Sequence, residues 1–119
     1  MRVKPRPKGE APSDHYFFMW NLTEKGLQNP EGVRDSLRRA SAMVQRLGGS
    51  CQLFVSIGGR YEMVGVAEGI DDTKAAELLH AVNALGTIRT TTFLKTRDFY
   101  LADYEAFAKN IKGLLDVKL

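Results

Sequence analysis

The segment that most constrains the fold is a run of large side chains at residues 15–22, with the sequence HYFFMWNL. Successive side chains of a strand point to opposite faces, so this run divides into two alternating sets. One set contains Tyr16, Phe18, Trp20 and Leu22, and the other contains His15, Phe17, Met19 and Asn21. Both sets are largely apolar, which is typical of a strand buried on both faces. We therefore expect a strand over 15–22 that is covered on each side.

Two helices are predicted from apolar residues that recur at steps of three and four. The first runs from Val33 to Leu47, with Asn29-Pro30 as a typical start and Gly48-Gly49 as its end. The second covers about 75–85, and the preceding Asp71-Asp72-Thr73 offers an N-cap.

Three further strands and a last helix complete the chain. Strand patterns cover 50–57 and 60–68, and the intervening Gly58-Gly59 predicts a tight hairpin because primed turns need positive φ. The Thr-rich segment 87–96 predicts a fourth strand, since β-branched residues suit a pleated surface. An amphipathic pattern over 99–115 predicts a C-terminal helix.

The order of these elements is strand–helix–strand–strand–helix–strand, which predicts an α+β domain of the ferredoxin-like type with an extra C-terminal helix. The two inner helices would cover one face of the sheet. Because the first strand is apolar on both sets, the other face needs a cover too. We expect the C-terminal helix to supply part of it and a second subunit to supply the rest, which predicts a homo-oligomer.

The N-terminal segment 1–14 differs from the rest of the chain. It holds three of the four prolines and four of the basic residues, and it shows no helical or strand period. We expect it to be a disordered basic leader, followed by one domain over 15–119. The net charge of +3 therefore describes the leader more than a binding face.

Localisation and compartment follow from absences in the sequence. No apolar run approaches the roughly 20 residues that span a bilayer, and no apolar segment follows the basic N-terminus as in a signal peptide. A single cysteine, Cys51, allows no internal disulfide. We expect a cytoplasmic protein that does not bind a membrane.

Three segments resemble the GYD domain family, which is named for a Gly-x-Tyr-Asp hairpin motif. They are 19–26 (MWNLTEKG), 59–62 (GRYE) and 86–92 (GTIRTTT), and the resemblance extends from about His15 to Lys95. It implies a bacterial or archaeal protein with a ferredoxin-like fold related to dimeric α/β barrels, and it implies no established activity. Glu62 stands where the motif usually has Asp, which puts a distance-sensitive role of that carboxylate in doubt.

A candidate ligand site consists of polar residues at strand positions. Asn21 ends the first strand, Tyr61 and Glu62 begin the third, and Arg89 lies within the fourth. In an antiparallel sheet these residues could converge near one sheet end, and we expect Trp20 and Phe93 to form its apolar walls.

Arg89 has two interpretations, because a buried guanidinium needs a carboxylate or several acceptors. In the structural one it pairs with Glu62 or with the backbone of a partner subunit. In the functional one it anchors a small anionic or carbonyl-bearing molecule.

Other chemistry finds little support in the sequence. The residues that could bind a metal lie in different elements without the spacing of metal ligands; they are His15, His80 and Cys51. We therefore predict no metal and no cofactor. The weak alternative is a carboxylate-supported metal site with His15 and Glu62. No nucleophile elbow or phosphate loop is present. The third strand lacks the aromatic pattern of RNA-recognition domains, so we expect no specific nucleic-acid binding.

Three functions remain open at this point. The favoured one is a homo-oligomeric small-molecule-binding or regulatory module. The second is a cofactor-free enzyme of the dimeric α/β-barrel kind, an oxygenase or isomerase in which Tyr61 or His15 handles protons and Arg89 stabilises an anion. The third is a purely structural assembly protein. The fold alone cannot decide among them, so whether the protein is an enzyme stays open.

Overall fold

The computed structural model describes residues 14–118, which form two compact units, Asp14–Thr96 and the C-terminal segment from Arg97 onward. Except for Asp14, the predicted leader lies outside the described residues. Each unit is described by itself, and the prediction of one domain over 15–119 stays a prediction.

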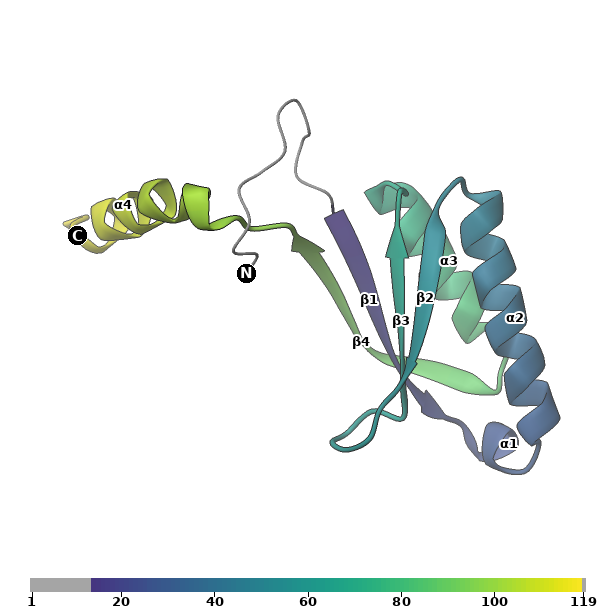
Figure 1. Ribbon diagram of the computed structural model, residues 1–119. Helices are drawn as coiled ribbons and strands as arrows, with labels where there is room; N and C mark the ends of the chain where they lie inside the picture. Colours follow the sequence, from purple (N-terminus) through teal and green to yellow (C-terminus); the bar gives the residue numbers. More distant parts are fainter. Residues whose placement is uncertain (1–13, 119) are drawn as a thin grey trace. The chain divides into compact units, whose positions relative to one another are not determined.

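The first unit is built on a four-stranded sheet (Figure 1). Its strands are β1 (Asp14–Leu22), β2 (Ser50–Val55), β3 (Met63–Glu68) and β4 (Ile88–Arg97), in the spatial order β2-β3-β1-β4. β3 is antiparallel to both of its neighbours. The helices are α1 (Glu24–Leu27), α2 (Pro30–Arg46) and α3 (Asp72–Asn83). The element order and strand order are those of the ferredoxin-like fold, which confirms the predicted fold class. Assembly into a dimeric barrel stays a prediction.

The hydrophobic core lies between the sheet and the helices α2 and α3, which cover the same sheet face (Figure 1). Tyr16, Phe18 and Trp20 of β1 are each only 2% exposed and pack with apolar residues of both helices. The even-numbered set of the first strand therefore faces the helices. At roughly 1.5–3 kcal/mol for each large buried side chain, this set is a major source of the stability of the unit.

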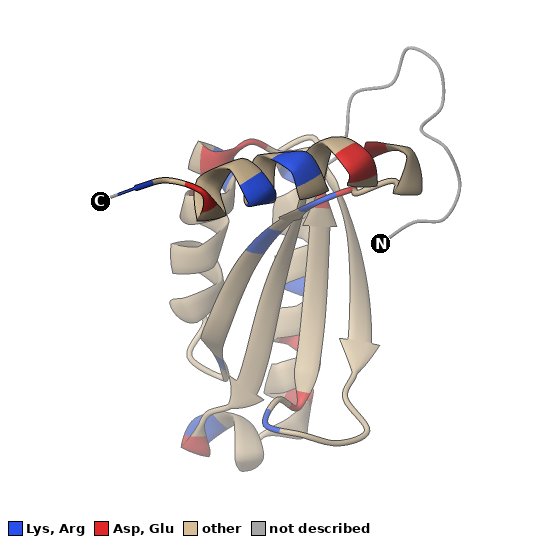
Figure 2. Cartoon of the chain, turned by 90° about the vertical axis from the view of Figure 1, so that its left-hand side faces the viewer, with Lys and Arg blue, Asp and Glu red and all other residues tan. Residues whose placement is uncertain are grey.

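The opposite face of the sheet, which we call the open face, has no helical cover within residues 14–96. It carries the odd-numbered set of β1 and the residues paired with it, namely Phe17 and Met19 with Val66 and Val64 of β3 and Phe54 of β2. Figure 2 looks onto this face, whose strands are mostly uncharged. Phe17 and Met19 are half-buried and Phe54 is 51% exposed. The expectation of full burial on both faces is thus met on one face of this unit.

The predicted caps occur where the sequence places them. Asn29 accepts a hydrogen bond from the Gly32 amide at the start of α2, and Asp71 accepts one from the Lys74 amide at the start of α3. Each cap satisfies an amide that the helix leaves unpaired. The short helix α1 was not predicted, and its start is capped by the hydroxyl of Thr23.

The hairpin between β2 and β3 differs from the prediction. β3 begins at Met63 rather than at residue 60, and residues 56–62 form a longer loop instead of a two-glycine turn. The Ser56 amide bonds to the Glu62 carbonyl and closes the loop at 3.0 Å. Gly59 has φ 91°, a conformation that favours glycine, so the glycine pair shapes this loop without tightening it.

Three contacts define how β4 lies against β1. The Thr23 amide bonds to the Thr87 carbonyl at 3.0 Å, the Trp20 indole Nε1 donates to Thr90 Oγ1 at 3.0 Å, and the Thr91 hydroxyl donates to the Met19 carbonyl at 3.2 Å. Residue numbers rise along β1 as they fall along β4, as expected for antiparallel strands. The same spacing places Arg89 opposite Asn21.

In β4, the alternation of side chains between the two faces of the sheet is interrupted after Thr91. Thr90 contacts Trp20 and Phe93 contacts Phe18, with ring centroids 4.9 Å apart, although Trp20 and Phe18 lie on the same face. In a regular strand, residues 90 and 93 would face opposite ways. We infer a β-bulge near Thr91 and Thr92, which adds one residue to this strand.

The second unit contains a short 3-10 turn (Leu101–Asp103) and helix α4 (Tyr104–Leu115). The ring of Phe107 meets that of Phe99 edge-on at 5.0 Å. α4 has no buried residue, and its apolar side chains Phe107, Ile111, Leu114 and Leu115 are 41–79% exposed. The helix itself was predicted, and its role as a cover for the open face stays a prediction. Over residues 14–118, none of the helices has the length and apolar character needed to cross a bilayer.

Candidate functional site

The predicted polar residues meet at one end of the open face. Asn21 follows Met19 by two positions on β1, so its side chain lies on the open face. Arg89 lies opposite Asn21 on β4, and directly opposed residues on one face have Cβ atoms about 4.5–5.5 Å apart. The prediction that Asn21 and Arg89 converge is therefore supported by the strand register.

Glu62 lies beside Asn21 on the other side of β1. Its amide donates to the Trp20 carbonyl at 3.0 Å, and its carboxylate Oε1 accepts a hydrogen bond from the Leu22 amide at 3.4 Å. These two contacts are made to Trp20 and Leu22, the residues on either side of Asn21. Glu62, Asn21 and Arg89 thus follow one another across three neighbouring segments of the sheet, and we call these three residues the polar row.

Tyr61 reaches past β1 to the far strand. Its hydroxyl lies 2.7 Å from Thr92 Oγ1 of β4, although Tyr61 precedes β3 and β1 lies between β3 and β4. This contact links the loop before β3 to the bulged part of β4. Tyr61 is half-buried, so its phenol borders the polar row without being sealed in the core.

Two groups of the polar row lack partners. The side-chain oxygen of Asn21 is buried, and among the described residues it accepts no hydrogen bond. The Arg89 side chain is exposed, and within residues 14–118 its guanidinium forms no ion pair or hydrogen bond, so it is not paired with Glu62. Buried polar atoms in folded proteins nearly always have a partner. The Asn21 oxygen is therefore an exception that the described residues do not account for.

The two predicted apolar walls need correction. Trp20 is a core residue, 2% exposed, and its side chain lies on the helix-covered face with its Nε1 bonded to Thr90. Phe93 packs against Phe18 and stacks on Tyr16 at 6.1 Å, also on that face. Alternation explains both placements: Trp20 adjoins Asn21 in sequence and so points the other way, and the bulge turns Phe93 inward.

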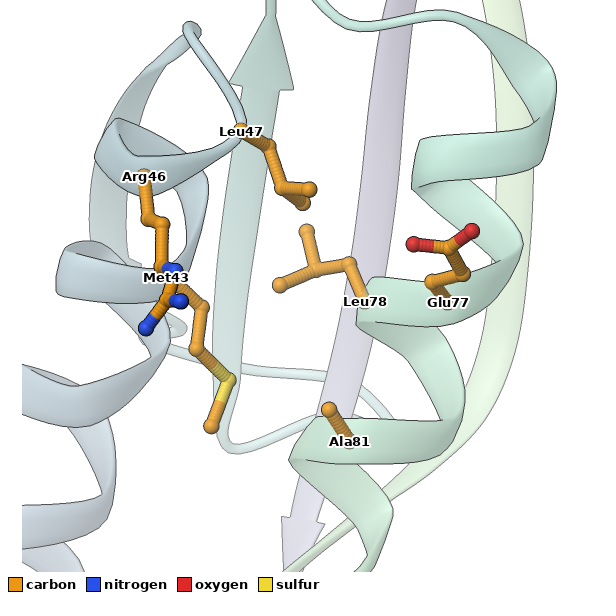
Figure 3. A pocket seen from close by; sticks show the side chains of 6 residues that line it. All are labelled: Met43, Arg46, Leu47, Glu77, Leu78 and Ala81. Carbon is orange, nitrogen blue, oxygen red and sulfur yellow. The ribbon is translucent and has the colours of Figure 1, made fainter.

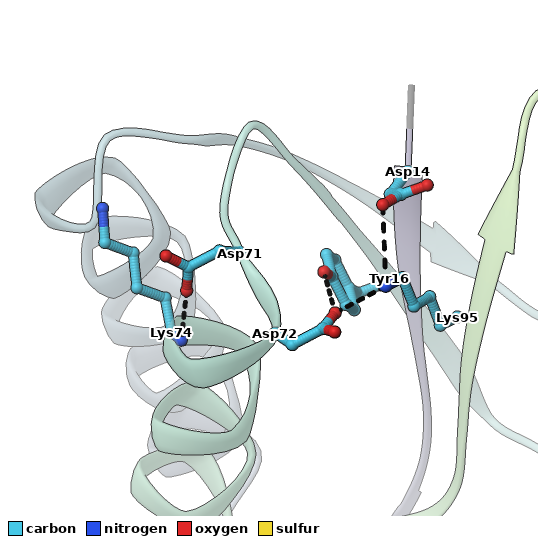
Figure 4. A network of polar contacts seen from close by, with 6 residues as sticks. All are labelled: Asp14, Tyr16, Asp71, Asp72, Lys74 and Lys95. Atoms are coloured by element: carbon cyan, nitrogen blue, oxygen red, sulfur yellow. Dashed lines mark hydrogen bonds and ion pairs between the residues drawn. The ribbon is translucent and has the colours of Figure 1, made fainter. Parts of the chain in front are cut away.

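A polar network not found from the sequence lies at the start of α3 (Figure 4). The Tyr16 hydroxyl donates to Asp72 Oδ1 at 2.6 Å, and Lys95 Nζ lies 2.7 Å from the same oxygen. Lys95 also lies 3.6 Å from Asp14 Oδ2 and 5.8 Å from the centre of the Tyr16 ring. The network ties β1, β4 and α3 together. Its members are far apart in sequence, and only the bulge of β4 brings Lys95 to this face.

Hydrogen bonding alters the titration of this network. The hydrogen bond to Asp72, with smaller contributions from burial and the nearby negative charge, raises the pKa of Tyr16. The hydrogen bond to Asp72 also raises the pKa of Lys95, against a smaller opposing effect of desolvation. In the folded chain the network therefore favours the protonated forms of Tyr16 and Lys95, both of which contact Asp72.

A groove of about 280 Å³ lies between α2 and α3 on the helical side (Figure 3). Leu47, Leu78, Met43 and Ala81 make most of its lining apolar, while Arg46 and Glu77 contribute one charge from each helix. Both charged side chains are exposed. The groove contains none of the residues of the polar row, so it is a separate surface.

Comparison with known proteins bears on the family and not on a reaction. The GYD domain family matches residues 16–99, and the comparison with curated proteins found no match. Among solved structures, the chain matches the crystal structure of a dye-decolorizing peroxidase (DyP) from Bacteroides thetaiotaomicron VPI-5482, with a TM-score of 0.45 and 9% sequence identity. The similarity covers 82% of this chain and 44% of that one, so this chain spans less than half of the peroxidase.

The matched residues include β1 from Tyr16 onward, the other three strands and the helices that cover them, and they make up more than half of the 119-residue chain. They also include the hairpin residues 59–62 on which the resemblance rests. This chain belongs to the GYD domain family.

Proposed function

We propose that this protein is a homo-oligomeric small-molecule-binding module whose ligand lies on the polar row. The observation that carries the proposal is the unpaired Arg89 opposite Asn21, whose side-chain oxygen is buried without a partner. Leaving a buried acceptor unsatisfied costs about 1–3 kcal/mol, which a bound ligand would recover. Glu62 and Tyr61 border the same place.

The chemistry of these groups sets the class of ligand. Arg89 offers a planar set of N–H donors, which suits a carboxylate or another oxygen-rich anion. Asn21 offers an amide oxygen that needs an N–H or O–H donor, while its own NH2 group can donate. A small anionic or carbonyl-bearing molecule that also carries a donor fits this pair. The neighbouring Met19 and Phe17 suit an apolar part of the same molecule.

Homo-oligomerisation is proposed because the open face is apolar. Phe17, Met19, Val64 and Phe54 form a continuous apolar surface by the strand register. A second copy that covers this surface would bury it and exclude water from the polar row. Interactions of Arg89 with an anion become stronger when water is excluded.

The enzymatic alternative has less support from the geometry. Tyr61 already bonds to Thr92, and His15 Nδ1 lies 3.1 Å from Glu68 Oε1. His15 precedes Asn21 by six positions on β1, which at about 3.3 Å per residue separates them by roughly 20 Å. His15 and Arg89 therefore cannot act on the same small substrate within one chain.

The test is native mass spectrometry of the protein purified from its expression host, with Arg89→Ala and Arg39→Ala as matched variants. Arg39 is exposed on α2, so its loss changes the same charge away from the polar row. We expect an oligomer that retains a defined small mass in the wild type and in Arg39→Ala, and the same oligomer without that mass in Arg89→Ala. Loss of the oligomer in Arg89→Ala would instead assign Arg89 to assembly. A wild-type oligomer without bound mass, in buffer free of competing anions, would favour the purely structural function.

A further inference from the structure

Strand β2 forms one edge of the sheet and exposes apolar side chains on both of its faces. Leu53 and Val55 lie on the helix-covered side of the sheet and are 44% and 80% exposed, while Phe54 lies on the open face and is 51% exposed. The following loop adds Ile57, which is fully exposed. An exposed apolar edge strand is an unpaired template for another strand.

The hydrogen-bonding direction along β2 follows from its pairing with β3. The Ser56 amide bonds to the Glu62 carbonyl, in line with the register that pairs Phe54 with Val64. In an antiparallel pair, the N–H and C=O groups of alternate residues point to the same neighbour. The even-numbered residues of β2 therefore bond to β3. The backbone groups of Cys51, Leu53 and Val55 point away from the sheet, where residues 14–118 supply no strand to receive them.

The two edge strands of the sheet differ in how well they are guarded against pairing with another chain. β4, the opposite edge, carries Arg89, Lys95 and Arg97 along its length and is interrupted by the bulge. Charges and bulges are the usual means by which edge strands avoid pairing with other chains. Residues 50–59 (SCQLFVSIGG) contain no charge and no proline. Of the two edges, β2 is thus the one open to pairing.

We propose that β2 is an interaction surface for a second copy of this chain, with the two β2 strands antiparallel across a two-fold axis near Leu53. In this register Leu53 pairs with its own counterpart, and Cys51 pairs with Val55 of the other copy. All three outward-facing residues then exchange both backbone hydrogen bonds. Registers shifted by two residues leave at least one of the three unpaired, so the centred register is favoured.

Charge and side-chain character identify the occupant as a second copy. Two-fold pairing brings each side chain against one of the same short segment, and like charges that oppose each other destabilise a pair. β2 brings no charges together, whereas two copies of β4 would oppose lysine and arginine residues. On the helix-covered side, the paired row consists only of Cys51, Leu53 and Val55 from each copy. The result is a continuous eight-stranded sheet, reached through a surface different from the open face.

The test is amide hydrogen exchange of the full-length protein, resolved by residue with NMR. The amides of Gln52 and Phe54 bond to β3 and should be protected in any folded state. The amides of Cys51, Leu53 and Val55 should be protected only when the edge is paired. We expect all five to exchange slowly at high protein concentration, and the three odd-numbered amides alone to lose at least tenfold protection on dilution.

Leu53→Lys should remove protection of the remaining odd-numbered amides and halve the mass measured by sedimentation, because two lysines would meet at the axis. Leu27→Lys is the matched control: Leu27 is 65% exposed and lies on α1, outside strand β2. Retained protection at Gln52 and Phe54 shows that a variant is folded. Fast exchange of the odd-numbered amides in the concentrated wild type, or protection independent of concentration, would overturn the proposal.

These outcomes are separate from those for ligand binding. If a second copy covered only the open face, the amides of Cys51, Leu53 and Val55 would still exchange quickly. Substitution of Arg89 does not alter the β2 edge. An edge-paired protein without ligand, and a ligand-binding protein with a free edge, are therefore distinguishable results.

Discussion

Gly65 on β3 is a position where one added methyl group should be costly. It lies opposite Phe18 of β1, on the sheet face covered by the helices. A Cβ atom built on Gly65 would lie 2.4 Å from Cη2 and 2.8 Å from Cζ3 of the Trp20 indole. Both distances are below any stable carbon–carbon contact. The indole has little freedom to move, because it is 2% exposed and its Nε1 is held by Thr90 at 3.0 Å.

Two opposing effects set the magnitude of Gly65→Ala. Overpacking of a filled core costs about 1–3 kcal/mol, while replacing glycine within a strand recovers about 0.5–1 kcal/mol of backbone entropy. The packing cost is at the upper part of its range here, since rigid ring atoms oppose the methyl group. We expect a net loss of about 1–2 kcal/mol in the free energy of unfolding. With a urea dependence of about 1.5 kcal/mol per molar, the midpoint falls by roughly 1 M.

Urea unfolding followed by Trp20 fluorescence measures this loss directly. Gly58→Ala is the matched control, because a Cβ atom at Gly58 meets no atom within 4 Å. The same substitution should cost much less in a Trp20→Phe background, since a phenyl ring lacks the atoms that the methyl group meets; circular dichroism follows that pair. A neutral Gly65→Ala, or an equal loss in both backgrounds, would refute the packing explanation.

Two further predictions concern buried polar contacts. The pKa of Tyr16 is raised from 10.0 by its bond to Asp72, so its contribution to stability is complete below about pH 10 and is lost as the pH rises above it. Tyr16→Phe should therefore flatten the fall in unfolding free energy between pH 9 and 11. The matched control is Tyr104→Phe, which removes the hydroxyl of an exposed tyrosine. Ser36→Ala removes the hydroxyl that lies 2.5 Å from the Thr87 hydroxyl in the core. The free energy of unfolding, measured by heat or urea, should fall by about 1–3 kcal/mol. Ser41→Ala in the same helix is the control and should change it little. An unchanged stability of Ser36→Ala would mean that the Thr87 hydroxyl finds another partner.

The sequence predicted the regular elements well because each has a strong local signal. The apolar stripe of α2, its Asn29 cap and the Asp71 cap of α3 are determined by nearby residues, and they occur as expected. The loop before β3 was predicted wrongly because Gly58-Gly59 carries the same local signal in a tight turn and in a longer loop. The bond from Ser56 to Glu62 decides between them, and that bond depends on the pairing of β2 with β3.

The positions of the candidate site residues in the sheet could be predicted in part for the same reason. Asn21, Glu62 and Arg89 could be grouped because each lies near a strand end whose neighbours follow from the topology. Trp20 and Phe93 were predicted as walls of the site, but they lie on the other face of the sheet. For Trp20 the strict alternation with Asn21 already indicated this, and its choice as a wall was inconsistent with it. The face of Phe93 could not be predicted, because the bulge of β4 leaves no mark in a run of three threonines.

The bulge divides β4 into two parts that are free to vary separately. Before it, Arg89 belongs to the open face and to the proposed ligand site; after it, Phe93 and Lys95 anchor the strand to the core and to α3. In a regular strand the side chains alternate between the two sheet faces without interruption. Gain or loss of one residue would then move the side chains that follow to the opposite face. Because the bulge restarts the alternation, residues in the first part of β4, where the proposed ligand site lies, can be substituted while the second part keeps the edge of the sheet in place.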